Sequence, residues 1–192
     1  MTNESPEDMQ RFADAMRDAI VSLPQDMKAM LRIVEDPDLG DADRVLAAGA
    51  LIHVLSAHNA IPGVRGLLAY VDDAIILRLV LERIEASEPE LIAAHRADSP
   101  ELFAPLAAQM DAVRAYLGER LAVLDKACDG LAEMSHQGHG AVECASTEEG
   151  TTWLYDAVHE ALIRELEFDE DDVTRALKEV DKIIRPLDQR LK

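Results

Sequence analysis

Two neighbouring carboxylates, Asp72 and Asp73, are the residues of this sequence whose type and spacing point most directly to chemistry. Carboxylate oxygens are the ligands that Mg²⁺ and Ca²⁺ prefer, so the pair is a candidate site for a metal-dependent or metal-sensing protein. The structural alternative is that both acids lie at the start of a helix, where free N–H groups and the helix dipole stabilise negative charge. We expect the structural role.

A second group lies further along the chain and consists of His136, His139 and Cys144, preceded by Cys128. Two histidines and two cysteines can form a tetrahedral Zn²⁺ site, and two residues separate His136 from His139, as in many such sites. The other spacings are unlike zinc motifs, because no C-x-x-C pair is present and Cys128 falls on an apolar stripe where a buried thiol is ordinary. We expect a Gly-containing loop with incidental histidines, and we predict no metal ion or other cofactor.

The remaining histidines of interest are His53 and His58, which are five residues apart. That separation is about 500° around a helix, so the two share no helical face, and we expect each to be a hydrogen-bonded residue of the core or its rim. The sequence also lacks G-x-S-x-G, a phosphate-binding Gly-rich loop that ends in Lys, H-E-x-x-H and a dinucleotide-binding fingerprint. We therefore predict no catalytic residue and a non-enzymatic protein.

The charge of the chain restricts its partners. Its 192 residues include 38 acids and 19 bases, for a formal net charge of -19. Such a polyanion repels phosphate backbones and anionic membrane surfaces, so we predict no binding to nucleic acid; an acidic mimic that occupies a nucleic-acid-binding protein is an alternative function. Two cysteines and an N-terminal stretch without a signal-peptide pattern favour a reducing, cytoplasmic location.

An uncharged stretch of 20 residues, 45–64, marks the centre of the fold. It is long enough to cross a bilayer, but polar and helix-breaking residues interrupt it, so we predict no membrane span. These interruptions are His53, Ser56, His58, Asn59 and Pro62. The stretch instead predicts a buried helical hairpin, with Asp41 as the cap of the first helix and a second helix beginning near Asp72, separated by Pro62 and the glycines after it.

The hairpin, residues 41–86, carries a recognisable residue pattern, and its characteristic residues lie in the loop and the second helix. Ile61 and Pro62 are followed eight residues later by Tyr70-Val71-Asp72-Asp73 and an apolar helix. This pattern resembles the signature of the YkvA-like family, a bacterial domain family of unknown function, and the resemblance implies a helical hairpin without implying an activity. Asn59 and Gly63 stand where the family usually has Asp, and Ala69 stands where it has Gly. Because two of four acids are missing, we expect no tightly bound divalent ion at Asp72 and Asp73.

Amphipathic patterns on both sides of the hairpin predict the other helices. Pro24 separates two N-terminal helices, one long amphipathic helix runs from about Pro105 to Glu133, and two more helices carry residues 153–166 and 173–187. The stretch from Ser146 to Glu149 resembles a capping box. With only 4% aromatic residues, the chain is predicted to be an all-α helical bundle. We expect a single domain, 1–192, in which flanking helices from 1–40 and 87–192 cover the hairpin core, 41–86.

The apolar stripe of the long helix, from Leu106 to Leu131, predicts how the protein acts. Packing within its own chain is the commoner way to cover such a stripe, and a second chain is the alternative. Because no catalytic set is present, we expect a function in protein–protein interaction. The partner would be another protein, or a second copy in a homodimer formed through the amphipathic helices.

Overall fold

The computed structural model describes residues 5–56, 58–164 and 166–191, and helices account for nearly all of their regular structure. The predicted all-α helical bundle is therefore confirmed. The exception among these residues is a two-stranded antiparallel ribbon of β1 (Ser135–His136) and β2 (His139–Gly140). Within the described ranges, no helix is both long enough and apolar enough to cross a bilayer.

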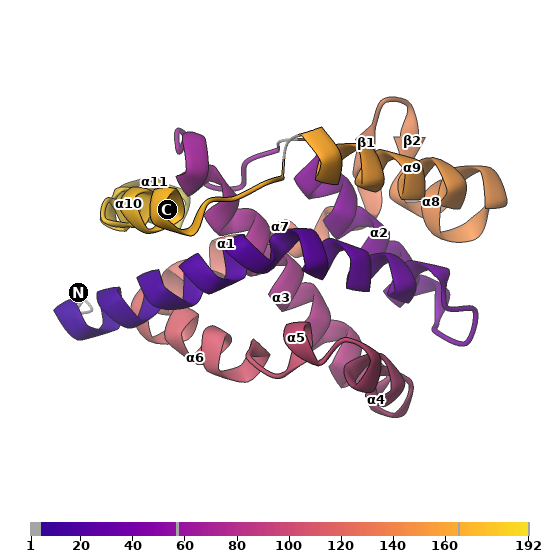
Figure 1. Ribbon diagram of the computed structural model, residues 1–192, viewed down its shortest axis with the longest axis horizontal. Helices are drawn as coiled ribbons and strands as arrows, with labels where there is room; N and C mark the ends of the chain where they lie inside the picture. Colours follow the sequence, from indigo (N-terminus) through magenta and orange to yellow (C-terminus); the bar gives the residue numbers. More distant parts are fainter. Residues whose placement is uncertain (1–4, 57, 165, 192) are drawn as a thin grey trace.

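Helix α1 (Pro6–Glu35) runs the length of the molecule (Figure 1) and packs against α2, α3, α6, α9 and α10. It begins where the Ser5 side chain accepts a 3.0 Å hydrogen bond from the backbone N–H of Asp8. The prediction of two N-terminal helices divided at Pro24 was wrong, because the helix continues through that proline. Leu23 and Met27, on either side of Pro24, are fully buried, and this packing outweighs the hydrogen bond that a proline removes.

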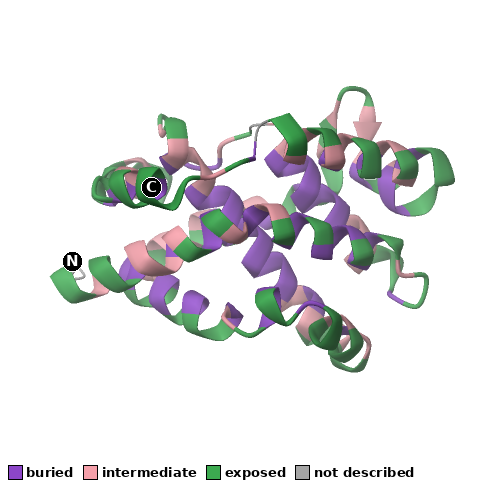
Figure 2. Cartoon of the chain, in the orientation of Figure 1, coloured by how far each residue is buried: buried purple, intermediate pink, exposed green. Residues whose placement is uncertain are grey.

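The predicted hairpin is formed by α2 (Asp41–Leu55) and α3 (Tyr70–Ser87), which pack against each other and against α1. Figure 2 shows that both helices are buried over most of their length. The residue that precedes α2 is Gly40, so Asp41 is its first residue and not its cap. The second helix begins at Tyr70, after the short 3-10 helix η1 (Gly66–Ala69), so Asp72 and Asp73 lie within its first turn.

One buried ion pair joins the hairpin to its neighbours. Arg78 of α3 is 1% exposed, and its Nη2 donates to Oδ2 of Asp26 at 3.1 Å. Its Nε donates to Oε1 of Gln109 at 2.6 Å, and its Nη1 donates to the carbonyl oxygen of Ala74 at 3.0 Å. Each nitrogen of this buried guanidinium therefore has an acceptor, as a buried charge requires.

The single long helix predicted from Pro105 to Glu133 was wrong, because the chain breaks at Gly118. The segment forms α6 (Leu106–Leu117), the 3-10 helix η2 (Gly118–Arg120), α7 (Leu121–Asp129) and the 3-10 helix η3 (Leu131–Glu133). Gly118 has φ 54° and ψ -129°, a backbone conformation that glycine adopts and other residues avoid. The break lets α6 pack on α1 and α7 on α3.

Most of the apolar stripe of this segment is covered within the chain. Its buried members are Leu106, Met110, Val113, Leu117, Leu124, Cys128 and Leu131. The stripe therefore gives no support to the expected homodimer, which stays a prediction. Two shorter helices, α4 (Pro89–Asp98) and α5 (Pro100–Phe103), connect the hairpin to α6.

Residues after η3 form the remaining helices: α8 (Ala141–Ser146), α9 (Glu148–Arg164), α10 (Glu170–Leu177) and α11 (Ile184–Arg190). The start of α9 is capped by Thr147, whose Oγ1 accepts a 3.0 Å hydrogen bond from the N–H of Gly150, one residue after the predicted cap at Ser146. The prediction of one continuous helix over 173–187 was also wrong, because the 3-10 helix η4 (Val180–Ile183) separates α10 from α11.

Helix α2 and η3 approach each other closely. Gly49 of α2 lies so close to the backbone of Leu131 that an added Cβ would overlap it.

Candidate functional site

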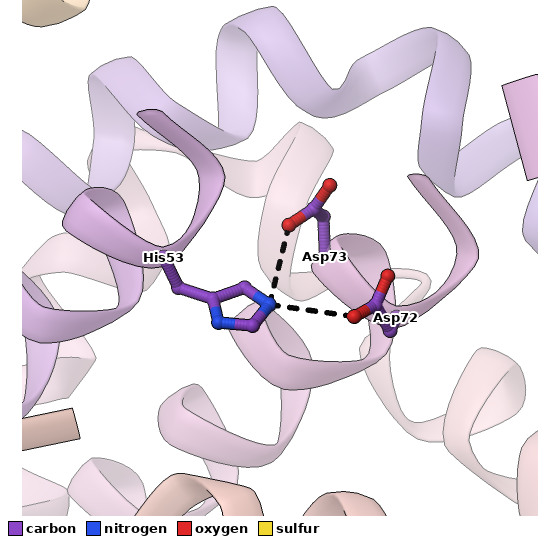
Figure 3. A group of neighbouring side chains, drawn as sticks. All are labelled: His53, Asp72 and Asp73. Carbon is purple, nitrogen blue, oxygen red and sulfur yellow. Dashed lines mark ion pairs between the residues drawn. The ribbon is translucent and has the colours of Figure 1, made fainter. Parts of the chain in front are cut away.

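Three ionisable side chains from the two helices of the hairpin meet at one point (Figure 3). His53 projects from the last turn of α2, and Asp72 and Asp73 project from the first turn of α3. Nε2 of His53 lies 3.5 Å from Oδ2 of Asp72 and 3.4 Å from Oδ1 of Asp73. The structure thus joins the predicted acid pair to a histidine that we expected to be a residue of the core or its rim.

All three residues are removed from solvent. His53 is 2% exposed, Asp72 is 1% exposed and Asp73 is 5% exposed. Three of their atoms, His53 Nε2, Asp72 Oδ1 and Asp73 Oδ1, nevertheless have no hydrogen-bond partner. Because a buried polar atom without a partner costs about 1–3 kcal/mol, three such atoms in one cluster need an explanation.

Asp72 also holds the loop that joins the two helices. Its Oδ2 accepts a 2.5 Å hydrogen bond from the backbone N–H of Ala60. Asn59 shapes the same loop, since its Oδ1 accepts from the N–H of Ile61 at 3.2 Å and its Nδ2 donates to the carbonyl oxygen of Val64 at 3.3 Å. Asn59 therefore has a structural role at a position where the YkvA-like signature has an acid.

Among the three residues of the cluster, Asp73 has a carboxyl group whose pKa is strongly shifted. Burial raises its pKa well above the usual value, and the neighbouring charge of Asp72 raises the pKa further. Burial acts because water no longer solvates the charged form, and Asp72 acts because a second negative charge lies nearby. A cation bound between the two carboxylates would remove this cost.

The distances in this cluster fit a small metal ion better than a hydrogen-bonded network. In a tetrahedral Zn²⁺ site with metal–ligand bonds of about 2.1 Å, neighbouring ligand atoms are about 3.4 Å apart. The two His53 Nε2 to carboxylate oxygen distances, 3.4 Å and 3.5 Å, match that separation and exceed the most common N–H···O length of about 2.9 Å. One ligand atom from each residue, all within 4.8 Å of one another, leaves a fourth tetrahedral position open.

A pocket of about 430 Å³ lies beside the cluster, and Asp73 forms part of its wall. The end of α2, the loop after it, η1, the first turn of α3 and the end of α9 enclose this space. Its lining residues are Val54, Leu55, His58, Asn59, Gly66, Leu67, Ala69, Tyr70, Asp73, Ala161 and Leu166. The His58 ring also contacts the cluster directly, since its centroid is 5.4 Å from that of His53 in an edge-on arrangement.

The second group named from the sequence is arranged differently. His136 and His139 pair across the β1–β2 ribbon, where the His139 ring stacks on Trp153 at 4.4 Å and Nδ1 of His139 lies 3.2 Å from Oε1 of Glu143. Cys144 is fully buried in α8, and burial raises the pKa of its thiol to about 11. In the part of the chain that the structure describes, these residues do not bring three candidate ligand atoms together, whereas His53, Asp72 and Asp73 do.

Sequence reasoning missed His53, although one signal was present. Neighbours of His53 in α2 are apolar and fully buried, including Leu51 and Ile52. A histidine inside an otherwise apolar buried helix needs a polar partner, and the acid pair at the start of the adjacent helix could supply one.

No protein-family model, no curated protein and no solved structure matches the chain. The likeness to the YkvA-like family therefore stays a resemblance in the residue pattern of the hairpin.

Proposed function

We propose that this protein binds a divalent cation with His53, Asp72 and Asp73 as its protein ligands, and that Zn²⁺ is the cation that suits the site best. The observation that carries the proposal is a buried cluster in which His53 Nε2 and Asp73 Oδ1 lack hydrogen-bond partners, and in which Nε2 lies 3.4 Å and 3.5 Å from one oxygen of each carboxylate, the ligand separation of a tetrahedral ion. The proposed function is therefore metal binding or metal sensing, and we assign no chemical reaction to the chain.

Charge balance supports a dication over a metal-free triad. Without a metal, two buried carboxylates face one imidazole, which carries at most a single positive charge, and a net negative charge stays buried. A dication with a neutral His53 neutralises both carboxylates. Elsewhere in the same core, the buried carboxylate of Asp26 faces the guanidinium of Arg78, so opposite charges are paired there.

The donor set favours Zn²⁺ over Mg²⁺ or Ca²⁺. Magnesium and calcium ions take six or more oxygen ligands, whereas an imidazole nitrogen with two carboxylate oxygens in a tetrahedral arrangement suits zinc. The sequence-based expectation of no ion considered Asp72 and Asp73 alone. We revise it because His53 adds a nitrogen ligand and because the site is buried.

The other functions expected from the sequence stay predictions. A role in protein–protein interaction rested on uncovered apolar stripes, and most of the stripe from Leu106 to Leu131 is buried within the chain. An acidic mimic of nucleic acid rests on the net charge of -19 alone. Neither of these two functions is supported by an arrangement of side chains comparable to the cluster of His53, Asp72 and Asp73.

Titration of chelator-treated protein with Zn²⁺ in a calorimeter tests the proposal. We expect one ion per chain for the wild type and the loss of that binding in His53→Gln and Asp73→Asn, with circular dichroism confirming that both variants fold. The matched control is His139→Gln, which removes a histidine paired with a carboxylate outside the cluster. Wild-type protein that binds no Zn²⁺, or loss of binding in the His139 variant instead, would contradict the proposal.

A further inference from the structure

We infer that His58 is the fourth protein ligand of the bound cation, so that the chain itself completes the coordination. This inference rests on the proposed function, because it assigns the position that His53, Asp72 and Asp73 leave open. Four protein ligands leave no place for water or substrate on a tetrahedral ion, as in structural zinc sites. Such a site suits metal binding or sensing without a reaction.

The loop after α2 brings His58 to the edge of the cluster. His58 comes two residues before Ala60, whose N–H donates to Oδ2 of Asp72 at 2.5 Å, so the backbone near His58 is fixed to one of the three ligands. Both His58 and Asp73 line the pocket of about 430 Å³, whereas His53 and Asp72 do not. His58 therefore lies on the side of the cluster where Asp73 borders open space.

The rings of His53 and His58 already have the separation that a shared ion requires. With Zn–N bonds of about 2.0–2.1 Å, each imidazole centroid lies about 3.2 Å from a tetrahedral ion, and the two centroids lie about 5 Å apart. The observed centroid distance is 5.4 Å, in an edge-on arrangement with 68° between the ring planes. The ligand atoms that lie within 4.8 Å of one another belong to His53, Asp72 and Asp73, so the His58 ring must turn to coordinate.

His58 can make this turn without breaking a buried interaction. Its side chain is exposed, and no hydrogen bond or ion pair to another residue of the described ranges holds its ring. Its contact with the His53 ring is edge-on and leaves the ring free to rotate about its side-chain bonds. Exposed side chains change rotamer within nanoseconds, so the fourth ligand can be recruited as the ion binds.

Charge favours an imidazole at the fourth position over an anion. A dication with two carboxylates is neutral, and a neutral His58 keeps it so, whereas a further carboxylate or a phosphate would restore a buried net negative charge. The described lining residues of the pocket include no Lys or Arg, and the whole chain carries a formal net charge of -19. An anion would therefore lack compensation there, and a histidine would need none.

Calorimetric titration of His58→Gln with Zn²⁺ tests the inference. We expect this variant to bind one ion per chain about tenfold or more weakly than the wild type, because three ligands remain, whereas His53→Gln loses binding. His159→Gln is the matched control and should keep the wild-type affinity. Like His58, His159 contacts another aromatic ring, but that ring is Tyr155 in α9, outside the cluster. Circular dichroism confirms that each variant folds.

Diethyl pyrocarbonate, which modifies accessible imidazole nitrogens, reports on His58 directly. Mass spectrometry should find His58 modified in the metal-free wild type, and one equivalent of Zn²⁺ should slow that reaction about tenfold or more, because coordination occupies the acceptor nitrogen. His159 should react equally in both samples. Wild-type protein that binds Zn²⁺ with His58 still fully reactive, or a His58→Gln variant with wild-type affinity, would overturn this inference and leave the proposed function standing. Absence of Zn²⁺ binding would overturn both.

Discussion

The backbone N–H of Ala60 donates a 2.5 Å hydrogen bond to Oδ2 of Asp72, a residue twelve positions further along the chain. One carboxylate therefore serves both the loop between α2 and α3 and the candidate metal site. Because Ala60 and Asp72 are both buried, this bond is shielded from water and fixes the loop against the first turn of α3.

Two substitutions at Asp72 should separate these roles. Asp72→Asn keeps an oxygen that can accept from Ala60 but weakens the ligand, so the loop should stay in place while Zn²⁺ affinity falls at least tenfold, since even outer-shell changes cost about 10–100-fold. Asp72→Ala should lose both. Hydrogen exchange of the Ala60 amide reports the loop, and calorimetry reports the metal; equal exchange in the two variants would contradict the dual role.

Bound Zn²⁺ should stabilise the folded chain. At a free Zn²⁺ concentration of one hundred times Kd, linkage adds about 2.7 kcal/mol to the free energy of unfolding. For a chain of this size, that free energy raises Tm by about 5–11 °C. Thermal denaturation with and without Zn²⁺ measures the shift, and Asp73→Asn should show none.

The same substitution should act in the opposite direction on metal-free protein. Because the pKa of Asp73 is raised in the folded state, the folded chain holds a proton that the unfolded chain releases above about pH 4. Stability of the metal-free wild type therefore falls as pH rises from that value until the folded pKa is passed, at about 1.4 kcal/mol for each pH unit in that window. Asp73→Asn removes this loss.

Chemical denaturation of both proteins across pH 4 to 8 checks this expectation. Metal-free Asp73→Asn should be the more stable protein, and its advantage should grow with pH before it levels off. Addition of Zn²⁺ should then favour the wild type. An advantage that stays constant with pH would show that the carboxyl of Asp73 is not the cause.

The hairpin should carry much of the stability of the fold. Leu51 of α2 and Ile76 of α3 are both fully buried, and replacing either by Ala should lower the free energy of unfolding by about 2–5 kcal/mol. His136→Ala, in the partly exposed β1–β2 ribbon, should cost less than about 0.5 kcal/mol. Urea denaturation distinguishes these outcomes, and equal small losses would show that the core lies elsewhere.

Two glycines provide a further matched pair. Gly49→Ala should lower the free energy of unfolding by about 1–3 kcal/mol or more, because the new methyl group overlaps the backbone of Leu131. At Gly130, the atom nearest to an added Cβ is the carbonyl oxygen of Ala127, at 3.6 Å, which is an ordinary contact distance. Gly130→Ala should therefore change the free energy of unfolding by less than about 0.5 kcal/mol. Similar effects at both positions would mean that η3 does not pack tightly on α2.

Sequence patterns predicted the elements whose signals are local. The uncharged stretch 45–64 and the glycines near Pro62 predicted the hairpin, because uniform apolarity and chain-breaking residues do not depend on distant parts of the chain. At Pro24 the local signal failed, since buried neighbours on both sides keep α1 continuous. At Gly118 the stripe of apolar residues continued through the break, so periodicity gave no sign of it.

The candidate site depends on the three-dimensional arrangement of the hairpin. Spacing along the chain paired Asp72 with Asp73 and made His53 look isolated. Their approach depends on how the described loop residues 58–69 fold back, which includes the bond from Ala60 to Asp72. A histidine and an acid pair that lie on different helices share no sequence motif, so only the packing of α2 against α3 could reveal them together.

The position of α1 has a consequence for how the protein is made. This helix leaves the ribosome before α10, yet it packs on α10, where Arg17 lies 3.7 Å from Glu170. The chain must therefore be synthesised through α10 before this part of α1 acquires that neighbour. Until then part of the apolar face of α1 stays uncovered, which is the kind of surface that chaperones bind during translation.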